Sequence, residues 1–308
     1  MHNSKSRLKT LMPESAQTGF QRFKKLVLRF LREKLEKVLF TGAWPAKLGI
    51  SAGFQGQVHV TKYRMRFPEF SLSLAPLHIV FASDFHMGPT THAQHIEKSI
   101  EKIAKLEPDL LLLGGDFVYL KAKFVNDWLR LMQKYLPESI EKYAVLGNHD
   151  NHLDPVYIAA ALEAAGIKML TNRCTTLEAP YNFISLHGLD DWQSGNPDVN
   201  AAFKKTAEIR IVLMHSPSNY LDLQNVDFDL AFCGHTHGGQ IARKDGSPIR
   251  AGSGPLSRQY NFGVFQIGEK MEKTLIVSRG VGFGSVPFRI NSAPEIVSIR
   301  LMPELKLR

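Results

Sequence analysis

Apolar and polar positions follow two different periods along the chain. Between positions 18 and 40, apolar residues recur at steps of three and four, and most positions between them are basic, which predicts one amphipathic helix. Gly42 and Pro45 end this pattern. Further helical stretches are expected over 93–106, 122–136 and 155–165.

Beyond Val58 the pattern changes to that of strands. Residues 59–67 alternate, a further strand is expected near 183–187, and 261–267 with 274–278 are typical of a hairpin. Short, mostly apolar runs indicate buried strands at 77–82, 110–113, 143–146, 209–214 and 230–233. We therefore expect an α/β fold in which two β-sheets form a sandwich flanked by helices, with an amphipathic helix at the N-terminus.

Each of the five apolar runs ends in residues that can bind a metal ion. The motifs are D-x-H at 84–86, G-D at 115–116, G-N-H-D at 147–150, a single His215, and G-H-x-H at 234–237. One such motif means little, because a lone Asp or His is more often a satisfied polar residue. Five in succession predict a shared site on loops at the carboxyl ends of the strands.

In this order and approximate spacing, the motifs resemble those of the calcineurin-like metallophosphoesterase family, over about 78–240 and plausibly to the C-terminus. The resemblance implies a hydrolase with two divalent metal ions, with Mn²⁺ expected and Fe or Zn as alternatives. The ligands it implies for the first metal are Asp84, His86, Asp116 and His237. Those for the second are Asp116, Asn148, His215 and His235, so that Asp116 bridges the pair.

The resemblance also implies a role for His149, which would contact the phosphoryl group or protonate the leaving group, with Asp150 or Asp84 orienting it. The alternative is that His149 only pairs with a neighbouring carboxylate. The expected catalytic residues are therefore His149 and Asp116, and Asn148 and His149 are expected to contact the substrate. Three other histidines lie near the motifs and are weaker candidates for the pocket: His92, His152 and His187.

The stretch from Arg279 to Ile296 is similar to one branch of that family, the bacterial membrane-associated phosphodiesterases. This branch includes UDP-diacylglucosamine pyrophosphohydrolases of lipid A biosynthesis. The similarity implies a lipid-linked nucleotide such as UDP-2,3-diacylglucosamine, cleaved to lipid X and UMP. Arg289 would then hold a phosphate group as a bidentate ligand; the alternative is an ion pair with Glu295 or another acid.

Other functions remain open at this point. The alternatives are a phosphodiesterase that acts on a soluble nucleotide or nucleic acid, and a protein phosphatase. A metal-free scaffold is disfavoured, because every ligand of the motif set and His149 are present.

Charge divides the chain into two parts. Residues 1–49 hold eleven Lys or Arg and three Glu, a net +8 of the chain's +9, which leaves about +1 for residues 50–308. We expect 1–49 to be a basic, amphipathic, membrane-associating segment and 50–308 to be the phosphoesterase domain. The alternative for the N-terminal helix is that it packs on the domain.

An anionic membrane surface and a phosphorylated lipid or nucleotide-lipid substrate are the expected partners. The expected location is peripheral, on the cytoplasmic face of the inner membrane. No nucleic-acid partner is expected, because the helix has no aromatic residue on its polar side and no nucleic-acid module follows it. The apolar runs are too short for a transmembrane helix, and Cys174 and Cys233 are expected to be free thiols.

Overall fold

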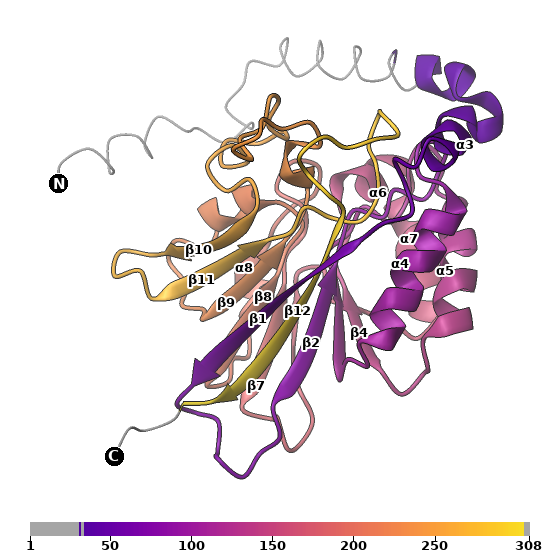
Figure 1. Ribbon diagram of the computed structural model, residues 1–308. Helices are drawn as coiled ribbons and strands as arrows, with labels where there is room; N and C mark the ends of the chain where they lie inside the picture. Colours follow the sequence, from indigo (N-terminus) through magenta and orange to yellow (C-terminus); the bar gives the residue numbers. More distant parts are fainter. Residues whose placement is uncertain (1–30, 32–33, 305–308) are drawn as a thin grey trace, which may run out of the picture. The chain divides into compact units, whose positions relative to one another are not determined.

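The computed structural model of the protein describes Leu31 and residues 34–304 (Figure 1). Both sheets belong to one compact unit that spans Ala43–Arg308. Most of the predicted helix at 18–40 lies outside the described residues, so this helix and the division of the chain at 49/50 stay predictions. In the described part, no helix has the length and apolar character needed to cross a bilayer.

The first sheet is mixed, with the strand order β1-β12-β2-β3-β4-β5. Strand β12 pairs parallel with β1 and antiparallel with β2, and β2 to β5 are parallel neighbours. The strands are β1 (His59–Phe67), β12 (Glu295–Pro303), β2 (Leu77–Ala82), β3 (Leu110–Leu113), β4 (Glu141–Ala144) and β5 (Lys168–Met169).

The second sheet has the strand order β10-β11-β9-β8-β7-β6. Its four inner strands β11, β9, β8 and β7 are parallel, and the two edge strands are antiparallel to their neighbours. The strands are β10 (Gly263–Ile267), β11 (Lys273–Val277), β9 (Leu230–Cys233), β8 (Ile209–Leu213), β7 (Ile184–Gly188) and β6 (Arg173–Thr176).

Helices precede β1 and lie in several of the connections between strands. They are α3 (Trp44–Ser51), α4 (Ala93–Lys105), α5 (Phe124–Tyr135), α6 (Asn148–Leu153), α7 (Pro155–Ala164) and α8 (Val199–Ala202), with the 3-10 turns η2 (Thr41–Ala43), η3 (Pro217–Leu221) and η4 (His237–Gly239). Capping explains where two of them begin. Nδ1 of His92 accepts from the N–H of Gln94 ahead of α4, and Asp154 accepts from the N–H of Tyr157 ahead of α7.

Two apolar layers hold the sheets in place. Figure 1 shows α4, α5 and α7 beside the first sheet, and Ile96, Ile100 and Ile103 of α4 are fully buried in this layer. The other layer lies between the sheets, where the rings of Phe81 and Phe232 are 5.3 Å apart. Each such buried side chain contributes roughly 1.5–3 kcal/mol. The layers therefore hold the strand ends of both sheets in fixed positions.

The expected α/β sandwich is confirmed, and the helices and strands predicted beyond residue 58 agree with the structure to within a few residues. The apolar runs did not predict β12, which lies inside the first sheet between β1 and β2. They also did not predict α6, whose first residues are the expected ligand Asn148 and the neighbouring His149.

Candidate metal centre

The five strand-end motifs meet because β2, β3 and β4 are parallel and so are β7, β8 and β9. Backbone hydrogen bonds continue past the strands into the loops. The N–H of Asp84 donates to the carbonyl of Gly115 over 2.9 Å, and the N–H of Gly234 donates to the carbonyl of His215 over 2.9 Å. The two sheets therefore position the loops that carry the ligand-type side chains.

Five of the seven predicted ligands have a left-handed backbone conformation. Their φ angles lie between 47° and 70°, and they are Asp84, His86, Asp116, His235 and His237. This conformation is uncommon for residues other than glycine and costs about 1–3 kcal/mol at a strained position. It persists only where the surrounding structure enforces it, which is typical of a functional site.

Glycines of the motifs let the backbone approach the ligand carboxylates. A Cβ atom on Gly147 would lie 2.2 Å from Oδ1 of Asp116, and one on Gly234 would lie 2.2 Å from Oδ2 of Asp84. Any side chain at these two positions would displace a predicted ligand.

Asp84, His86 and His237 form the first group of candidate ligands. Nε2 of His86 lies 2.9 Å from Nε2 of His237, which in turn lies 3.4 Å from Oδ1 of Asp84. One ligand atom from each of the three residues lies within 4.8 Å of the other two. These atoms converge closely enough to bind one ion between them.

Asp116, His215 and His235 form the second group. Nε2 of His215 lies 3.3 Å from Oδ2 of Asp116, 3.2 Å from Oδ1 of Asn148 and 3.2 Å from Nδ1 of His235. Oδ2 of Asp116 also lies 3.5 Å from Nε2 of His86 in the first group. One carboxylate oxygen thus faces ligands of both groups, as a bridging ligand would.

The donor atoms suit divalent ions. Four imidazoles, two carboxylates and an amide oxygen are a set that Mn, Fe and Zn accept. Burial lowers the pKa of His86 to about 3, so its ring is neutral and offers a lone pair. Burial raises the pKa of Asp84, and a bound cation would offset the cost of burying its charge. The residues therefore fit two divalent ions, while the identity of the metal stays a prediction.

Asp116 and His215 attract each other strongly. Burial is the largest single effect and opposes a charge on either residue, but the combined attraction of the neighbouring charges outweighs it. His215, His149 and His86 together lower the pKa of Asp116 well below its usual value, and Asp116, Asp84 and Asp191 together raise that of His215 well above its own. A metal ion at Nε2 of His215 would replace the proton that this raised pKa keeps on the ring.

Protein atoms orient the two imidazoles of the second group. Nδ1 of His215 lies 2.7 Å from the carbonyl of Gly114, and Nε2 of His235 lies 2.8 Å from the carbonyl of Ser253. These contacts use one nitrogen of each ring and leave the other facing the centre. Ser253 was not predicted, because it lies in a Gly-Ser-Gly loop that carries no ligand motif.

Ser83 is a further residue that the motifs did not predict. Its hydroxyl donates to Oδ2 of Asp84 over 2.6 Å, and the backbone N–H of His235 donates to the same oxygen over 3.0 Å. Together these donors hold the Asp84 carboxylate. The position of Ser83, between a buried strand and a ligand, was the only signal in the sequence.

His149 lies at the centre without belonging to the seven ligands. Its backbone N–H donates to Oδ1 of Asp116 over 2.7 Å, and its ring centroid lies 4.8 Å from that of His86. Asp150 accepts from the backbone N–H groups of Phe117 and Gly147, each over 3.0 Å. Burial and the charge of Asp116 raise the pKa of Asp150 to about 7. Asp150 therefore holds the loop that carries Asn148 and His149.

Arg289 lies beside the first group of ligands, and protein atoms occupy its donors. Its guanidinium donates to the carbonyls of Gly282 and Arg279, each over 2.6 Å, and to Nδ1 of His237 over 3.1 Å. The alternative ion pair with Glu295 is not formed, because Glu295 pairs with Arg279 over 3.2 Å. Arg289 as a phosphate ligand stays a prediction.

Two of the three weaker candidates have structural contacts. His187 is buried, with Nε2 2.7 Å from the hydroxyl of Ser185 and its ring stacked on Phe203 at 4.2 Å. His92 caps α4. His152 lies in α6, four residues after Asn148, and is partly exposed.

Comparison with known proteins identifies the class. The model of the calcineurin-like phosphoesterase family matches residues 77–239, which is more than half of the chain, and the chain belongs to this family. It is a metal-dependent phosphoesterase, and the seven predicted ligands all lie within the matched region.

Individual relatives are similar over most of the chain. Phosphodiesterase YaeI of Escherichia coli K12 is 29% identical over 85% of this chain and 98% of its own length. The uncharacterized metallophosphoesterase YkuE of Bacillus subtilis 168 is 29% identical over 72% of this chain and 78% of its own. The crystal structure of TT1561 of Thermus thermophilus superposes with a TM-score of 0.43 at 11% identity, over 67% of this chain and 91% of that one.

Proposed function

We propose that the protein hydrolyses a phosphodiester or pyrophosphate bond in a lipid-linked nucleotide at a membrane surface, with UDP-2,3-diacylglucosamine as the type of substrate. The observation that carries the two-metal chemistry is the position of Asp116, whose Oδ2 lies 3.3 Å from Nε2 of His215 and 3.5 Å from Nε2 of His86. The seven ligands predicted from the motifs are the ones that would hold the two ions.

The bound ions would supply Lewis-acid activation of a water molecule and of the phosphoryl group. The chain's own residues would do the rest. Asp116 orients His149 through its backbone N–H, and the His149 ring lies against His86 and Tyr119 with centroid distances of 4.8 and 5.2 Å. From there His149 would donate a proton to the leaving oxygen. No Ser or Cys nucleophile is required.

Exposed apolar side chains near the centre support an amphiphilic substrate. Phe54, after α3, is 59% exposed, and its ring lies 5.9 Å from that of Phe288. Ile290 is 47% exposed, and its N–H donates to the carbonyl of Gln240, three residues after the ligand His237. Apolar groups exposed next to a catalytic centre are typical of a surface that contacts lipid or another protein.

Ile249 extends this set of apolar groups. It is 57% exposed, and its N–H donates to the carbonyl of Ile241, which forms a β-bridge with Ile290. We call Phe54, Ile249 and Ile290 the apolar rim. The rim would contact acyl chains while the phosphate groups reach the metal ions.

Two other observations support the membrane assignment. The predicted helix at 18–40 has seven Lys or Arg against two Glu, which favours an anionic surface. The name of the relative YaeI, a phosphodiesterase, supports a diester or anhydride over a monoester. The peripheral location on the cytoplasmic face of the inner membrane, and Mn²⁺ as the metal, are parts of the same proposal.

A substrate panel tests the proposal. The full chain loaded with Mn²⁺ should cleave UDP-2,3-diacylglucosamine in mixed micelles faster than a cyclic nucleotide, an aryl phosphodiester or DNA. Deletion of residues 1–42 should reduce activity on the micellar lipid and binding to anionic vesicles, while activity on the aryl phosphodiester survives, because the predicted ligands start at Asp84. Equal loss of both activities would overturn the membrane role, and cleavage of DNA alone would overturn the lipid substrate.

A further inference from the structure

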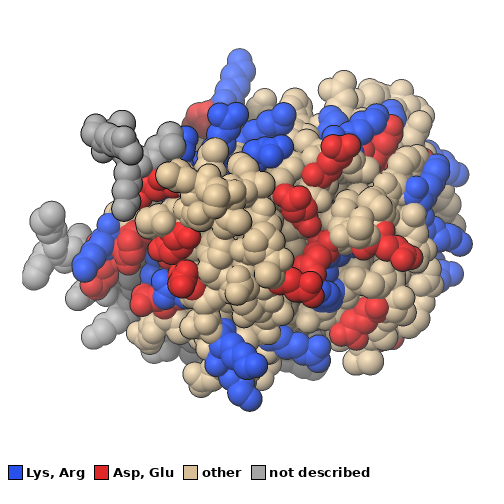
Figure 2. Space-filling view, turned by 90° about the horizontal axis from the view of Figure 1, so that it is seen from below, with Lys and Arg blue, Asp and Glu red and all other residues tan. Residues whose placement is uncertain are grey.

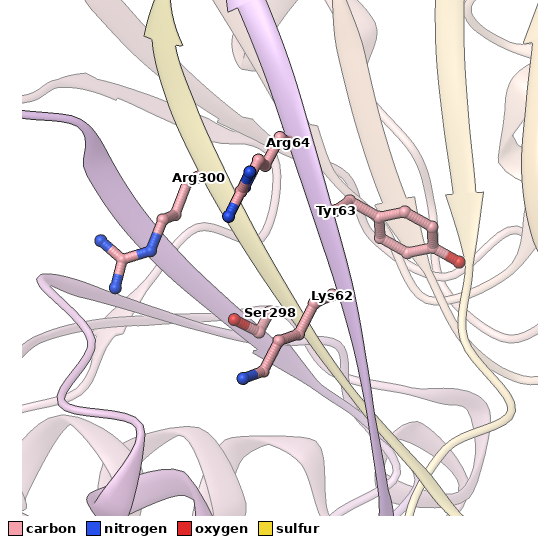
Figure 3. A pocket seen from close by; sticks show the side chains of 5 residues that line it. All are labelled: Lys62, Tyr63, Arg64, Ser298 and Arg300. Carbon is pink, nitrogen blue, oxygen red and sulfur yellow. The ribbon is translucent and has the colours of Figure 1, made fainter.

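A surface cavity of about 480 Å³ lies on the first sheet, and none of its residues belongs to the metal centre. It is lined by Lys62, Tyr63 and Arg64 of β1 and by Ser298 and Arg300 of β12. Figure 3 shows Lys62, Arg64, Ser298 and Arg300 on one side of β1 and Tyr63 on the other. Three cationic side chains therefore share one face of the sheet.

The register of the strands brings like charges together. β1 and β12 are parallel, with Lys62 opposite Ser298 and Arg64 opposite Arg300. Like charges at opposed positions destabilise a sheet. An anion between the two guanidinium groups would remove this repulsion.

The three cations are exposed and have no ionic partner. Within residues 34–304 none of them forms an ion pair, unlike Arg210, which pairs with Asp229, and Lys168, which pairs with Glu141. On the face in Figure 2, basic and acidic side chains lie interspersed. The cavity thus concentrates unpaired positive charge in a domain whose net charge is close to zero.

The floor of the cavity is polar and fixed. Ser298 is 5% exposed, and its hydroxyl lies 2.9 Å from Nε2 of His78, which is 4% exposed. Burial and then the charges of Arg300 and Lys62 lower the pKa of His78, while the charge of Asp109 opposes them. A hydroxyl group between three cations offers a further polar contact to a bound oxyanion.

Protection of a sheet edge explains the positions of only two of the three cations. β1 is an edge strand, and Lys62 and Arg64 would discourage other chains from pairing with it. Arg300 lies on β12, which already pairs with β1 on one side and β2 on the other. This strand has no free edge to protect, so Arg300 calls for another role.

We propose that the cavity binds a small phosphate-bearing anion, such as inorganic phosphate or a phosphate monoester, between Arg64, Arg300 and Lys62. Guanidinium groups match the oxygen geometry of phosphate in a bidentate way, and a dianion offsets most of the local charge. The volume is in the range of sites for small ligands. This site is separate from the metal centre and does not depend on the substrate proposed above.

Equilibrium dialysis with labelled inorganic phosphate tests the proposal on the full, metal-loaded chain. Wild type should bind one more phosphate per chain than Arg64→Ala/Arg300→Ala, because the metal centre is common to both. If the extra site persists in the double variant, its affinity should be roughly tenfold lower or worse. Arg130→Ala, which removes an exposed arginine of α5 that pairs with Asp127, is the matched control and should bind as wild type does.

Two further measurements keep the test decisive. Turnover of an aryl phosphodiester and the Tm without phosphate should not fall in the double variant, and Arg64→Gln/Arg300→Gln serves if the alanines impair folding. Added phosphate should raise the Tm of wild type more than that of either double variant. Equal phosphate binding by all variants would overturn the proposal. A second outcome would also overturn it. If the double variants bound phosphatidylglycerol vesicles more weakly while their phosphate binding stayed unchanged, the cations would contact a membrane and not a small anion.

Discussion

Oδ2 of Asp116 lies 3.3 Å from Nε2 of His215, and this contact joins the two sheets of the protein. Asp116 follows β3 of the first sheet, and His215 follows β8 of the second. Since each residue is held by its own sheet, the metal centre depends on the packing of one sheet against the other. Changes in the apolar layer between the sheets should therefore affect metal binding before they unfold the chain.

His149 is predicted to act on the leaving group. His149→Asn should lower kcat by roughly a hundredfold or more with both metals retained, because the side chain contributes to the transition state. The loss should shrink for nitrophenolate, which needs no proton to leave. Steady-state kinetics on a good and a poor leaving group checks this, and equal losses on both would argue against proton donation.

Arg289 is predicted to act through His237. Its Nη2 donates to Nδ1 of that ring, so Arg289→Ala should weaken binding at the first metal site by about 10–100-fold. Arg289→Lys should not restore it, since lysine cannot reproduce the several bonds of the guanidinium. Metal titration measures the effect. A higher KM with unchanged metal affinity would instead support the phosphate-binding role predicted from the sequence.

The apolar rim is predicted to serve lipid substrates alone. Phe54→Ser/Ile290→Ser should reduce kcat/KM on a diacylated substrate in micelles by about tenfold, because burial of both side chains is lost. Activity on an aryl phosphodiester should not change. Leu72→Ser, which alters a 72% exposed leucine between β1 and β2, is the control. Loss of both activities would show that the rim side chains stabilise the fold and do not serve the lipid substrate alone.

His95 is predicted to make the fold sensitive to acid. It is fully buried, with Nδ1 accepting from the N–H of Gly56 and Nε2 3.0 Å from the carbonyl of Val281. Burial lowers its pKa to about 4, below the unfolded value near 6.5, so the unfolded chain binds more protons between these values. Stability should therefore fall as pH drops below 6.5, by about 2 kcal/mol between pH 7.5 and 5.

Urea unfolding at the two pH values measures this effect. His95→Gln should be less stable at pH 7.5 but should lose about 2 kcal/mol less than wild type on acidification, because the titrating ring is gone. Other buried histidines contribute equally to both proteins and cancel in the comparison. The same pH dependence in wild type and variant would show that His95 does not carry it.

Much of the fold could be predicted because burial on both faces is visible in the sequence. The strands at 77–82, 110–113 and 230–233 are apolar runs in which only His78 is polar, and their bounds agree with the structure. β12 was missed because its apolar residues are interrupted by Ser298 and Arg300, which line the cavity on one face. A strand inside a sheet that carries polar residues on one face does not form a continuous apolar run in the sequence.

The candidate ligands came from a different feature of the sequence. The strand-end motifs give residue types and order, and parallel strands bring their ends to one edge. The contacts of Ser253 and Arg289 were not predictable, because both residues reach the site from loops whose path depends on tertiary packing. The left-handed φ angles of Asp84 and Asp116 were not predictable either, since only the folded chain enforces them.

Metal content in pure, active protein is the most direct test of the account. Because Asp116 faces both groups of ligands, the full chain should contain two divalent ions per molecule. Asp116→Ala should lose the tightly bound pair together with turnover, whereas the circular dichroism spectrum should stay that of a folded α/β protein. Mass spectrometry of metals on gel-filtered samples, read beside the turnover of an aryl phosphodiester, gives the answer. A single tightly bound ion in the active wild type, or full activity in Asp116→Ala, would contradict the two-metal centre.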